Sequence, residues 1–123
     1  MNKFIFTILL FALFAGLASN VLSQTQAELN REAAATFQRA DARLNDIYRR
    51  VLASAAAVDD ERKQKLIKAQ RAWVVFRDAE AEFEADNLRG GTAYSMEYDG
   101  VRTNLTEERV KALTGILQEQ KEQ

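Results

Sequence analysis

Apolar and small residues recur at steps of three and four along a first stretch of the chain, from about Thr25 to Ala57. Such steps bring side chains onto one stripe of a helix, so the pattern predicts a long amphipathic helix. Val58 then leads into Asp59 and Asp60, which are good N-cap residues for a second helix. The inward side of the first helix is predicted to carry Leu29, Ala33, Phe37, Ala40, Leu44, Ile47, Val51 and Ala55.

The second helix is expected to end near Asn87 to Gly91, where paired glycines permit the left-handed conformation of a helix C-terminus. Proline is absent from the chain, and no glycine interrupts either of these two stretches. The inward side of the second helix is predicted to carry Leu66, Ala69, Trp73, Phe76, Glu80 and Phe83.

A third helix is predicted from about Thr92 to Gln120, with Gly100 as the position of a kink, since an interior glycine costs about 1 kcal/mol relative to alanine. Asn104 with Glu107 resembles a capping box that would restart a helix there, but we expect one helix. Its helical steps fall at Tyr94, Tyr98, Val101, Leu105, Val110, Leu113 and Leu117. Short connections make consecutive helices antiparallel, so the predicted fold is all-α: an antiparallel bundle of three long helices.

Polar residues also fall on the inward stripes, where each needs a partner because an unpaired buried polar group costs about 1 to 3 kcal/mol. Residues at equal distances from a turn lie at the same height in antiparallel helices. Reflection about position 59 places Asp41 opposite Arg77, and reflection about Gly90 places Trp73 opposite Thr106. The predicted structural polar network consists of Asp41, Asn45, Tyr48, Gln70, Trp73, Arg77, Thr106 and Arg109.

Within this network, Asp41 and Arg77 are expected to form an ion pair, while Tyr48, Gln70 and Arg109 form a second cluster. One interpretation is that these groups fix the register of the bundle and perform no chemistry. The alternative is a polar pocket between the helices that binds a ligand.

The N-terminus has the order of residues found in a secretory signal peptide. Met1, Asn2 and Lys3 precede an apolar run from Phe4 to Phe14, and small residues follow. We expect residues 1–23 to be the signal, cut after Ala18 or Ser23, and residues 24–123 to form one helical domain in the periplasm or outside the cell. A retained anchor is the alternative, but the run is short for a membrane span, which needs roughly 20 apolar residues.

Composition excludes several classes of function. The 17 basic and 18 acidic residues nearly balance, and loss of Lys3 with the signal leaves 16 against 18, so nothing favours a nucleic-acid partner. The chain has no histidine and no cysteine, which removes the commonest general base, metal ligand and thiol nucleophile. The remaining carboxylates, such as Glu80, Glu82 and Glu84, are expected to form a solvated helix face. We therefore predict a protein that is not an enzyme and that binds no cofactor or metal.

A set of short motifs recurs in order along nearly all of the part of the chain that follows the signal. The motifs are Gln26-Ala27-Glu28-Leu29-Asn30, Ala40-Asp41, Leu44-Asn45, Tyr48, Ala69-Gln70-Arg71-Ala72-Trp73, Phe76-Arg77-Asp78, Gly90-Gly91-Thr92, Met96, Leu105-Thr106, Arg109 and Leu113. With these motifs the chain resembles the LprI-like lysozyme-inhibitor family. The resemblance implies an exported helical domain and, for the protein that gives the family its name, inhibition of lysozyme.

The chain departs from this family pattern at three positions. Many relatives carry cysteines where this sequence has Glu32, Ala81 and Val101. The resemblance implies that the last two would bridge the second and third helices near their shared turn, so this chain lacks that disulfide. It also lacks the cysteine that a bacterial lipoprotein anchor requires.

Two classes of binding function remain. The first is an inhibitor of lysozyme that makes contact through the turn between the second and third helices. The second is an interaction module that binds another envelope protein or self-associates, because Val74 and Val75 widen the apolar surface of the second helix. In a third reading of the turn, Tyr94 and Tyr98 simply pack the end of the bundle. The candidate partner-binding residues are Arg89, Gly90, Gly91, Tyr94, Met96 and Tyr98.

Overall fold

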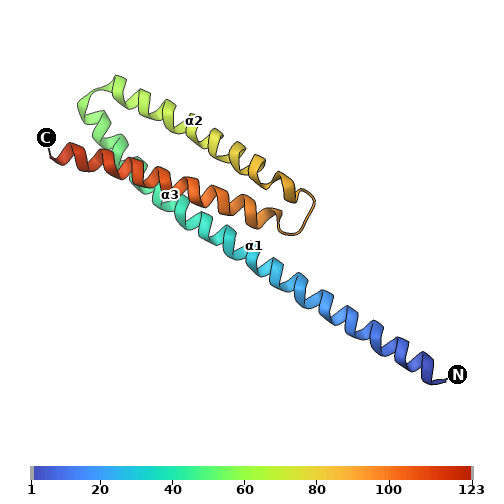
Figure 1. Ribbon diagram of the computed structural model, residues 1–123. Coiled ribbons are helices and arrows are strands. Elements are labelled where there is room, and N and C mark those ends of the chain that lie inside the picture. The colour runs from blue at the N-terminus through green and yellow to red at the C-terminus, as the bar shows by residue number, and fades with distance from the viewer. Residues whose placement is uncertain (1, 123) are drawn as a thin grey trace.

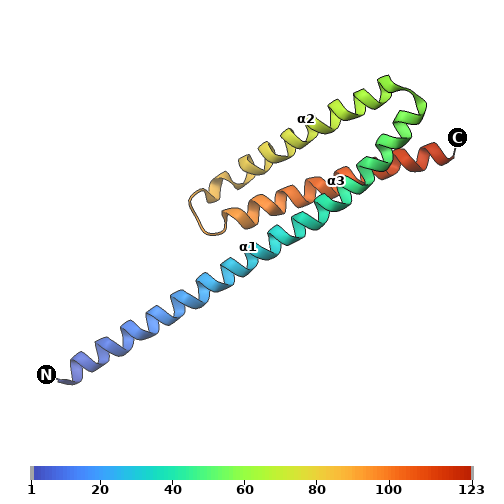
Figure 2. The same cartoon turned by 180° about the vertical axis from the view of Figure 1, so that it is seen from behind.

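The computed structural model describes the backbone of residues 2–122 and, within it, the side chains of residues 25–120 and 122. Three long helices, α1 (Asn2–Val58), α2 (Asp60–Ala85) and α3 (Tyr94–Lys121), are joined by a tight turn and by a loop that contains the 3-10 helix η1 (Asp86–Leu88). Helices α2 and α3 fold back beside the C-terminal half of α1 (Figures 1 and 2). The predicted all-α antiparallel bundle is therefore confirmed.

The signal predicted at residues 1–23 lies outside the part of the chain whose side chains are described, so its cleavage stays a prediction. Within the described part, no helix combines the length and the apolar character that crossing a membrane requires.

The first turn is built by Asp59, whose extended backbone precedes α2. Its Oδ1 atom accepts a hydrogen bond of 2.6 Å from the backbone N–H of Arg62, and Asp60 and Glu61 occupy the first helical turn. These acidic groups satisfy free N–H groups and complement the positive end of the helix dipole. The predicted start of the second helix is confirmed.

The second turn depends on Gly90, whose φ of +78° lies in the left-handed region. The N–H of Gly91 donates to the carbonyl of Leu88 at 2.9 Å, which closes the turn after η1. Helix α3 then begins at Tyr94, two residues after the predicted start, and continues through Gly100 without a restart at Asn104.

We predict opposite effects for the same substitution at two glycines. Gly90→Ala is expected to lower the free energy of unfolding by about 1 kcal/mol, because an L-residue is strained at positive φ. Gly115→Ala should raise it by up to about 1 kcal/mol, because this glycine lies inside α3 with open space around its missing Cβ. Urea denaturation of both variants measures the two shifts. If both variants changed the free energy of unfolding in the same direction, the left-handed conformation assigned to Gly90 in the turn would be contradicted.

The hydrophobic core lies between α1 and α3, and α2 runs alongside α3 and packs against both of these helices (Figure 1). Leu44, Ile47, Val51 and Leu113 form its buried centre. Partly buried residues from all three helices pack against this centre, namely Tyr48, Leu66, Trp73, Val110, Ile116 and Leu117.

Helix α2 is rotated relative to the predicted orientation. Phe76 and Phe83 were expected to face inward, but they are 51% and 77% exposed, and Ala69 is exposed as well. The buried residues of α2 are instead Gln70, Arg77, Ala81 and Ala85. Two fully buried alanines allow the helix backbone to approach its neighbours closely, which a phenylalanine at the same positions would prevent.

Leu29 of α1 was also expected inside the bundle and is 42% exposed. The next residue, Asn30, donates from Nδ2 to the carbonyl of Thr92 at 2.8 Å, so Leu29 lies near the loop that precedes α3, at the end of the bundle.

Candidate functional site

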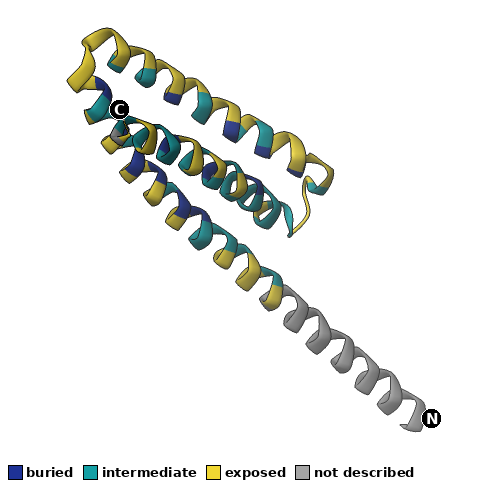
Figure 3. Ribbon diagram, turned by 60° about the vertical axis from the view of Figure 1, so that its left-hand side comes forward, coloured by how far each residue is buried: buried dark blue, intermediate teal, exposed yellow. Residues whose placement is uncertain are grey.

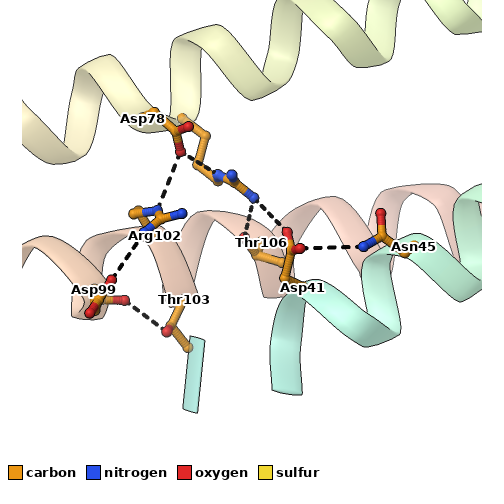
Figure 4. Close-up of polar contacts among 8 residues, drawn as sticks. Asp41, Asn45, Asp78, Asp99, Arg102, Thr103 and Thr106 are labelled. Atoms are coloured by element: carbon orange, nitrogen blue, oxygen red, sulfur yellow. Dashed lines mark hydrogen bonds and ion pairs between the residues drawn. The ribbon is translucent and has the colours of Figure 1, made fainter. Parts of the chain in front are cut away.

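The guanidinium of Arg77 joins all three helices. Its side chain is only 5% exposed, and Nη1 donates to Asp41 Oδ1 of α1 at 2.9 Å and, more weakly, to Thr106 Oγ1 of α3 at 3.4 Å. Nε donates to Asp78 Oδ1 on the same helix at 2.8 Å. Figure 4 shows Asp41, Asp78 and Thr106 converging from the three helices. One cation thus holds the middle of the bundle in register.

Aromatic rings enclose the same guanidinium. Its Cζ atom lies 5.0 Å from the ring centre of Phe37 and 5.4 Å from that of Trp73. A cation over an aromatic face gains electrostatic energy, and the rings exclude the water that would compete for the carboxylates. Asp41, at 37% exposure, is the side of the ion pair that still reaches solvent.

A second polar contact lies between α2 and α3. Arg109 Nε donates to Oε1 of the buried Gln70 at 3.1 Å, and Arg109 Cζ lies 5.8 Å from the ring centre of Trp73. Burial lowers the pKa of Arg109, but the guanidinium stays charged because arginine does not lose its proton in the physiological pH range. Trp73 therefore lies close to the guanidinium groups of both Arg77 and Arg109.

Two predicted members of the network occupy its edge. Asn45 is exposed, contrary to the inward position expected, because it lies at the border of the α1 stripe, and its Nδ2 donates to Asp41 Oδ2 at 3.3 Å. Tyr48 packs against the hydrophobic core. Of the cluster expected from Tyr48, Gln70 and Arg109, the structure shows the hydrogen bond between Gln70 and Arg109. The inclusion of Tyr48 in that cluster stays a prediction.

A third group of charges, centred on Arg102, is not among the residues predicted from the sequence. Its Nη1 donates to Asp99 Oδ1 at 3.1 Å, and its Nε lies 3.3 Å from Asp78 Oδ1 as an ion pair without hydrogen-bond geometry. Its Cζ lies 3.6 Å from the ring centre of Phe37. Reflection about Gly90 places Arg102 opposite Asp78. This contact was therefore predictable from the sequence by the same rule that gave the other layers.

Together these contacts make a continuous chain of alternating charge. It runs from Asp41 through Arg77, Asp78 and Arg102 to Asp99. Phe37 lies against both arginines, and the carboxylate of Asp78 pairs with both of them. Each charge in this chain is paired with a neighbouring opposite charge, although the buried Arg102 Nε makes its ion pair with Asp78 without a hydrogen bond. The pairing favours the structural interpretation over a ligand pocket.

The turn between α2 and α3 forms a separate surface. Arg89 is 75% exposed, and its Nε and Nη2 donate to the two carboxylate oxygens of Asp86 at 2.8 and 2.5 Å. The hydrogen bonds from Arg89 lower the pKa of Asp86, so the pair stays charged over the neutral range. Gly90 and Gly91 are exposed beside it.

Two stacked tyrosines follow this turn at the start of α3. The rings of Tyr94 and Tyr98 lie 6.1 Å apart at an interplanar angle of 10°, and both residues are half-buried. Arg102 Cζ lies 4.9 Å from the Tyr98 ring centre. Burial raises the pKa of Tyr98, although Arg102 opposes the shift, so the hydroxyl remains a neutral hydrogen-bond donor at physiological pH.

Helix α1 ties the turn in place. Asn30 Nδ2 binds the carbonyl of Thr92, and Gln26 Nε2 donates both to Asn30 Oδ1 at 3.0 Å and to Met96 Sδ at 3.9 Å. Met96 is half-buried. The loop therefore has a defined conformation, and the tyrosine pair both packs the bundle end and keeps part of its surface accessible.

Among the described side chains, no group of three or more acidic residues is arranged to hold a metal ion. A shallow hollow lined by Asp59, Glu61, Arg62 and Lys65 lies beside the first turn, far along the bundle from the loop that carries Arg89. Its lining is charged and exposed.

Comparison with known proteins gives two matches. The family model described as lysozyme inhibitor LprI matches residues 18–113. A protein of Rhizobium meliloti (strain 1021), described as uncharacterized, is 34% identical over 104 residues, which cover 76% of this chain and 75% of that protein. No solved structure matches the chain.

Proposed function

Because the chain belongs to the LprI lysozyme-inhibitor family, we propose that it is an exported binding protein of the bacterial envelope that inhibits lysozyme through the turn between α2 and α3. The observation that carries the proposal is the stacked pair of Tyr94 and Tyr98, held half-exposed beside a loop that α1 fixes in place. A fixed aromatic surface loses little entropy on binding, and tyrosine is enriched among the residues that dominate interface energies.

The charges of the turn suit the chemistry of the proposed target. Lysozyme cleaves a glycosidic bond with two carboxylates beside a cleft that binds sugar. Arg89 presents a largely exposed guanidinium, whose planar set of donors matches a carboxylate. Its pairing with Asp86 holds the group near the loop before binding. In this proposal, Arg89 approaches the carboxylates while the tyrosines pack against the rim of the cleft.

Export is the second part of the proposal. The signal at residues 1–23, cut after Ala18 or Ser23, would deliver the domain of residues 24–123 to the periplasm or the medium. That is the compartment in which a lysozyme acts on the cell wall.

Calorimetric titration against lysozyme, together with a turbidity assay of cell lysis, tests the contact. Tyr94→Ala and Arg89→Ala are each expected to weaken binding by roughly tenfold or more, because truncating a central anchor commonly costs about 2 kcal/mol. Lys65→Ala, an exposed change beside the other turn, is the matched control and should bind as the parent does.

Circular dichroism first verifies that each variant is folded. No detectable binding of the parent chain would overturn the inhibitor proposal. Binding that survives both Tyr94→Ala and Arg89→Ala would instead place the contact on a helix face.

A further inference from the structure

Residues 89–92 of the turn between α2 and α3 are all exposed, so burial does not hold them in one conformation (Figure 3). The first half of the turn closes on itself, because the N–H of Gly91 donates to the carbonyl of Leu88 at 2.9 Å. The bond within the second half is longer, since the N–H of Tyr94 lies 3.4 Å from the carbonyl oxygen of Gly91. A segment that starts with two glycines has many accessible conformations. The second half of the turn therefore needs an anchor from another element.

Helix α1 supplies that anchor. Asn30 Nδ2 donates to the carbonyl of Thr92 at 2.8 Å. This carbonyl lies just outside α3, because the first bond of the helix runs from the N–H of Glu97 to the carbonyl of Ala93 at 3.2 Å. Thr92 thus offers an acceptor at the entry to the helix, and a side chain of α1 binds it.

The orientation of the Asn30 side chain is set by Gln26. A carboxamide has a donor end and an acceptor end, so only one of its two orientations lets Asn30 bind a carbonyl. Gln26 Nε2 donates to Asn30 Oδ1 at 3.0 Å, which leaves Asn30 Nδ2 facing Thr92. The same Nε2 atom also donates to Met96 Sδ at 3.9 Å in the first turn of α3. All four residues belong to the motifs on which the family resemblance rests.

We propose that Asn30, oriented by Gln26, is a positioning residue that holds the turn in the conformation in which it meets lysozyme. The inference rests on the proposed function, because it concerns the same surface. Arg89 and Tyr94 lie on either side of the segment that the bond to Thr92 holds, so this bond sets the spacing between the two anchors. A turn that is already held in its bound conformation loses less entropy on binding, which raises the affinity.

The variant Asn30→Ala removes the bond and leaves every side chain of the turn unchanged. Alanine is a better helix former than asparagine, so the substitution does not weaken α1 itself. We expect the dissociation constant for lysozyme, measured by calorimetry on the chain purified after export, to rise about fivefold, the factor that corresponds to one ordinary hydrogen bond. Asn104→Ala is the matched control. It makes the same substitution at an exposed position of α3, about three turns from Tyr94, and should bind as the parent does.

Amide hydrogen exchange in the free protein separates positioning from a general loss of stability. Exchange of the N–H groups of Gly91 and Tyr94 reports opening of the turn, whereas exchange at the fully buried Leu113 reports opening of the core. In Asn30→Ala we expect faster exchange in the turn and an unchanged rate at Leu113. A substitution that only destabilised the fold would accelerate exchange at both places.

The variant Gln26→Ala tests whether Gln26 acts through Asn30. We expect it to weaken binding by less than Asn30→Ala does, because the bond to Thr92 can still form but its donor is no longer held in place. The double variant with both alanines should bind no more weakly than Asn30→Ala alone. A further loss of affinity in the double variant would contradict the orienting role of Gln26.

The outcomes distinguish this inference from the proposed function. If the parent binds lysozyme and Asn30→Ala binds equally well, the positioning role is overturned while the inhibitor proposal stands. The same conclusion follows if the affinity falls but exchange at Leu113 accelerates as much as exchange in the turn. If the parent does not bind, the inhibitor proposal is overturned and this inference with it.

Discussion

Replacement of Arg77 by alanine is expected to lower the free energy of unfolding by about 3 kcal/mol. Removing one partner of a buried ion pair typically costs about 3 to 5 kcal/mol, and the lower end applies because Asp41 can still reach solvent. The loss has three sources: the hydrogen bonds to Asp41 and Asp78, the contact with two aromatic rings, and the space left among buried side chains. Urea denaturation followed by circular dichroism measures it.

Two further variants separate the causes. Arg71→Ala, an exposed change on the same helix, should alter stability by less than about 0.5 kcal/mol. Arg77→Lys keeps the charge but lacks the planar set of donors that contacts two carboxylates, so its loss should fall between those of the two alanine variants. If Arg77→Ala were no more destabilising than Arg71→Ala, the central position given to this guanidinium would be wrong.

The layers of the bundle were predictable because antiparallel helices follow a simple reflection. Reflection about position 59 placed Asp41 opposite Arg77, and the two are hydrogen-bonded in the structure. Gln70 and Arg109, expected in one cluster, are hydrogen-bonded as well. Reflection about Gly90 was less accurate. It placed Trp73 opposite Thr106, whereas Thr106 contacts Arg77. The difference is one helical turn, which the length of an arginine side chain spans. Reflection therefore gives the height of a residue and leaves the reach of its side chain undetermined.

The orientation of α2 was not predictable from periodicity, because this helix carries two apolar stripes. One contains Ala81 and Ala85, and the other contains Phe76 and Phe83. Hydrophobicity alone predicts that the side with the two phenylalanines faces the core. In the structure the alanine side faces it, because the close packing of the helices leaves room only for small side chains. The contacts of Phe37 with the guanidinium groups of Arg77 and Arg102 were not predictable either. In the sequence, Phe37 is one apolar position among others on the inward stripe of α1, and nothing there distinguishes it from an ordinary core residue.

Ala81 is fully buried and Val101 is buried, so apolar side chains occupy the two positions at which the family resemblance implies a disulfide. The two residues belong to α2 and α3, which pack against each other and are joined by the turn at Gly90. The reciprocal experiment restores the bridge by Ala81→Cys with Val101→Cys. A cross-link closing a loop of roughly 20 residues is expected to stabilise the protein by about 3 kcal/mol, chiefly by restricting the unfolded chain.

The comparison that isolates this effect is between the oxidised and reduced forms of the same double variant. Reduction removes the bridge but leaves both cysteine side chains, so any packing cost at Val101 cancels in the difference. We expect the urea midpoint of the oxidised form to exceed that of the reduced form and the Val101→Cys variant alone to show no dependence on reductant. Because a disulfide requires Cα atoms less than about 7 Å apart, two free thiols after oxidation would show that α2 and α3 are spaced differently at this height.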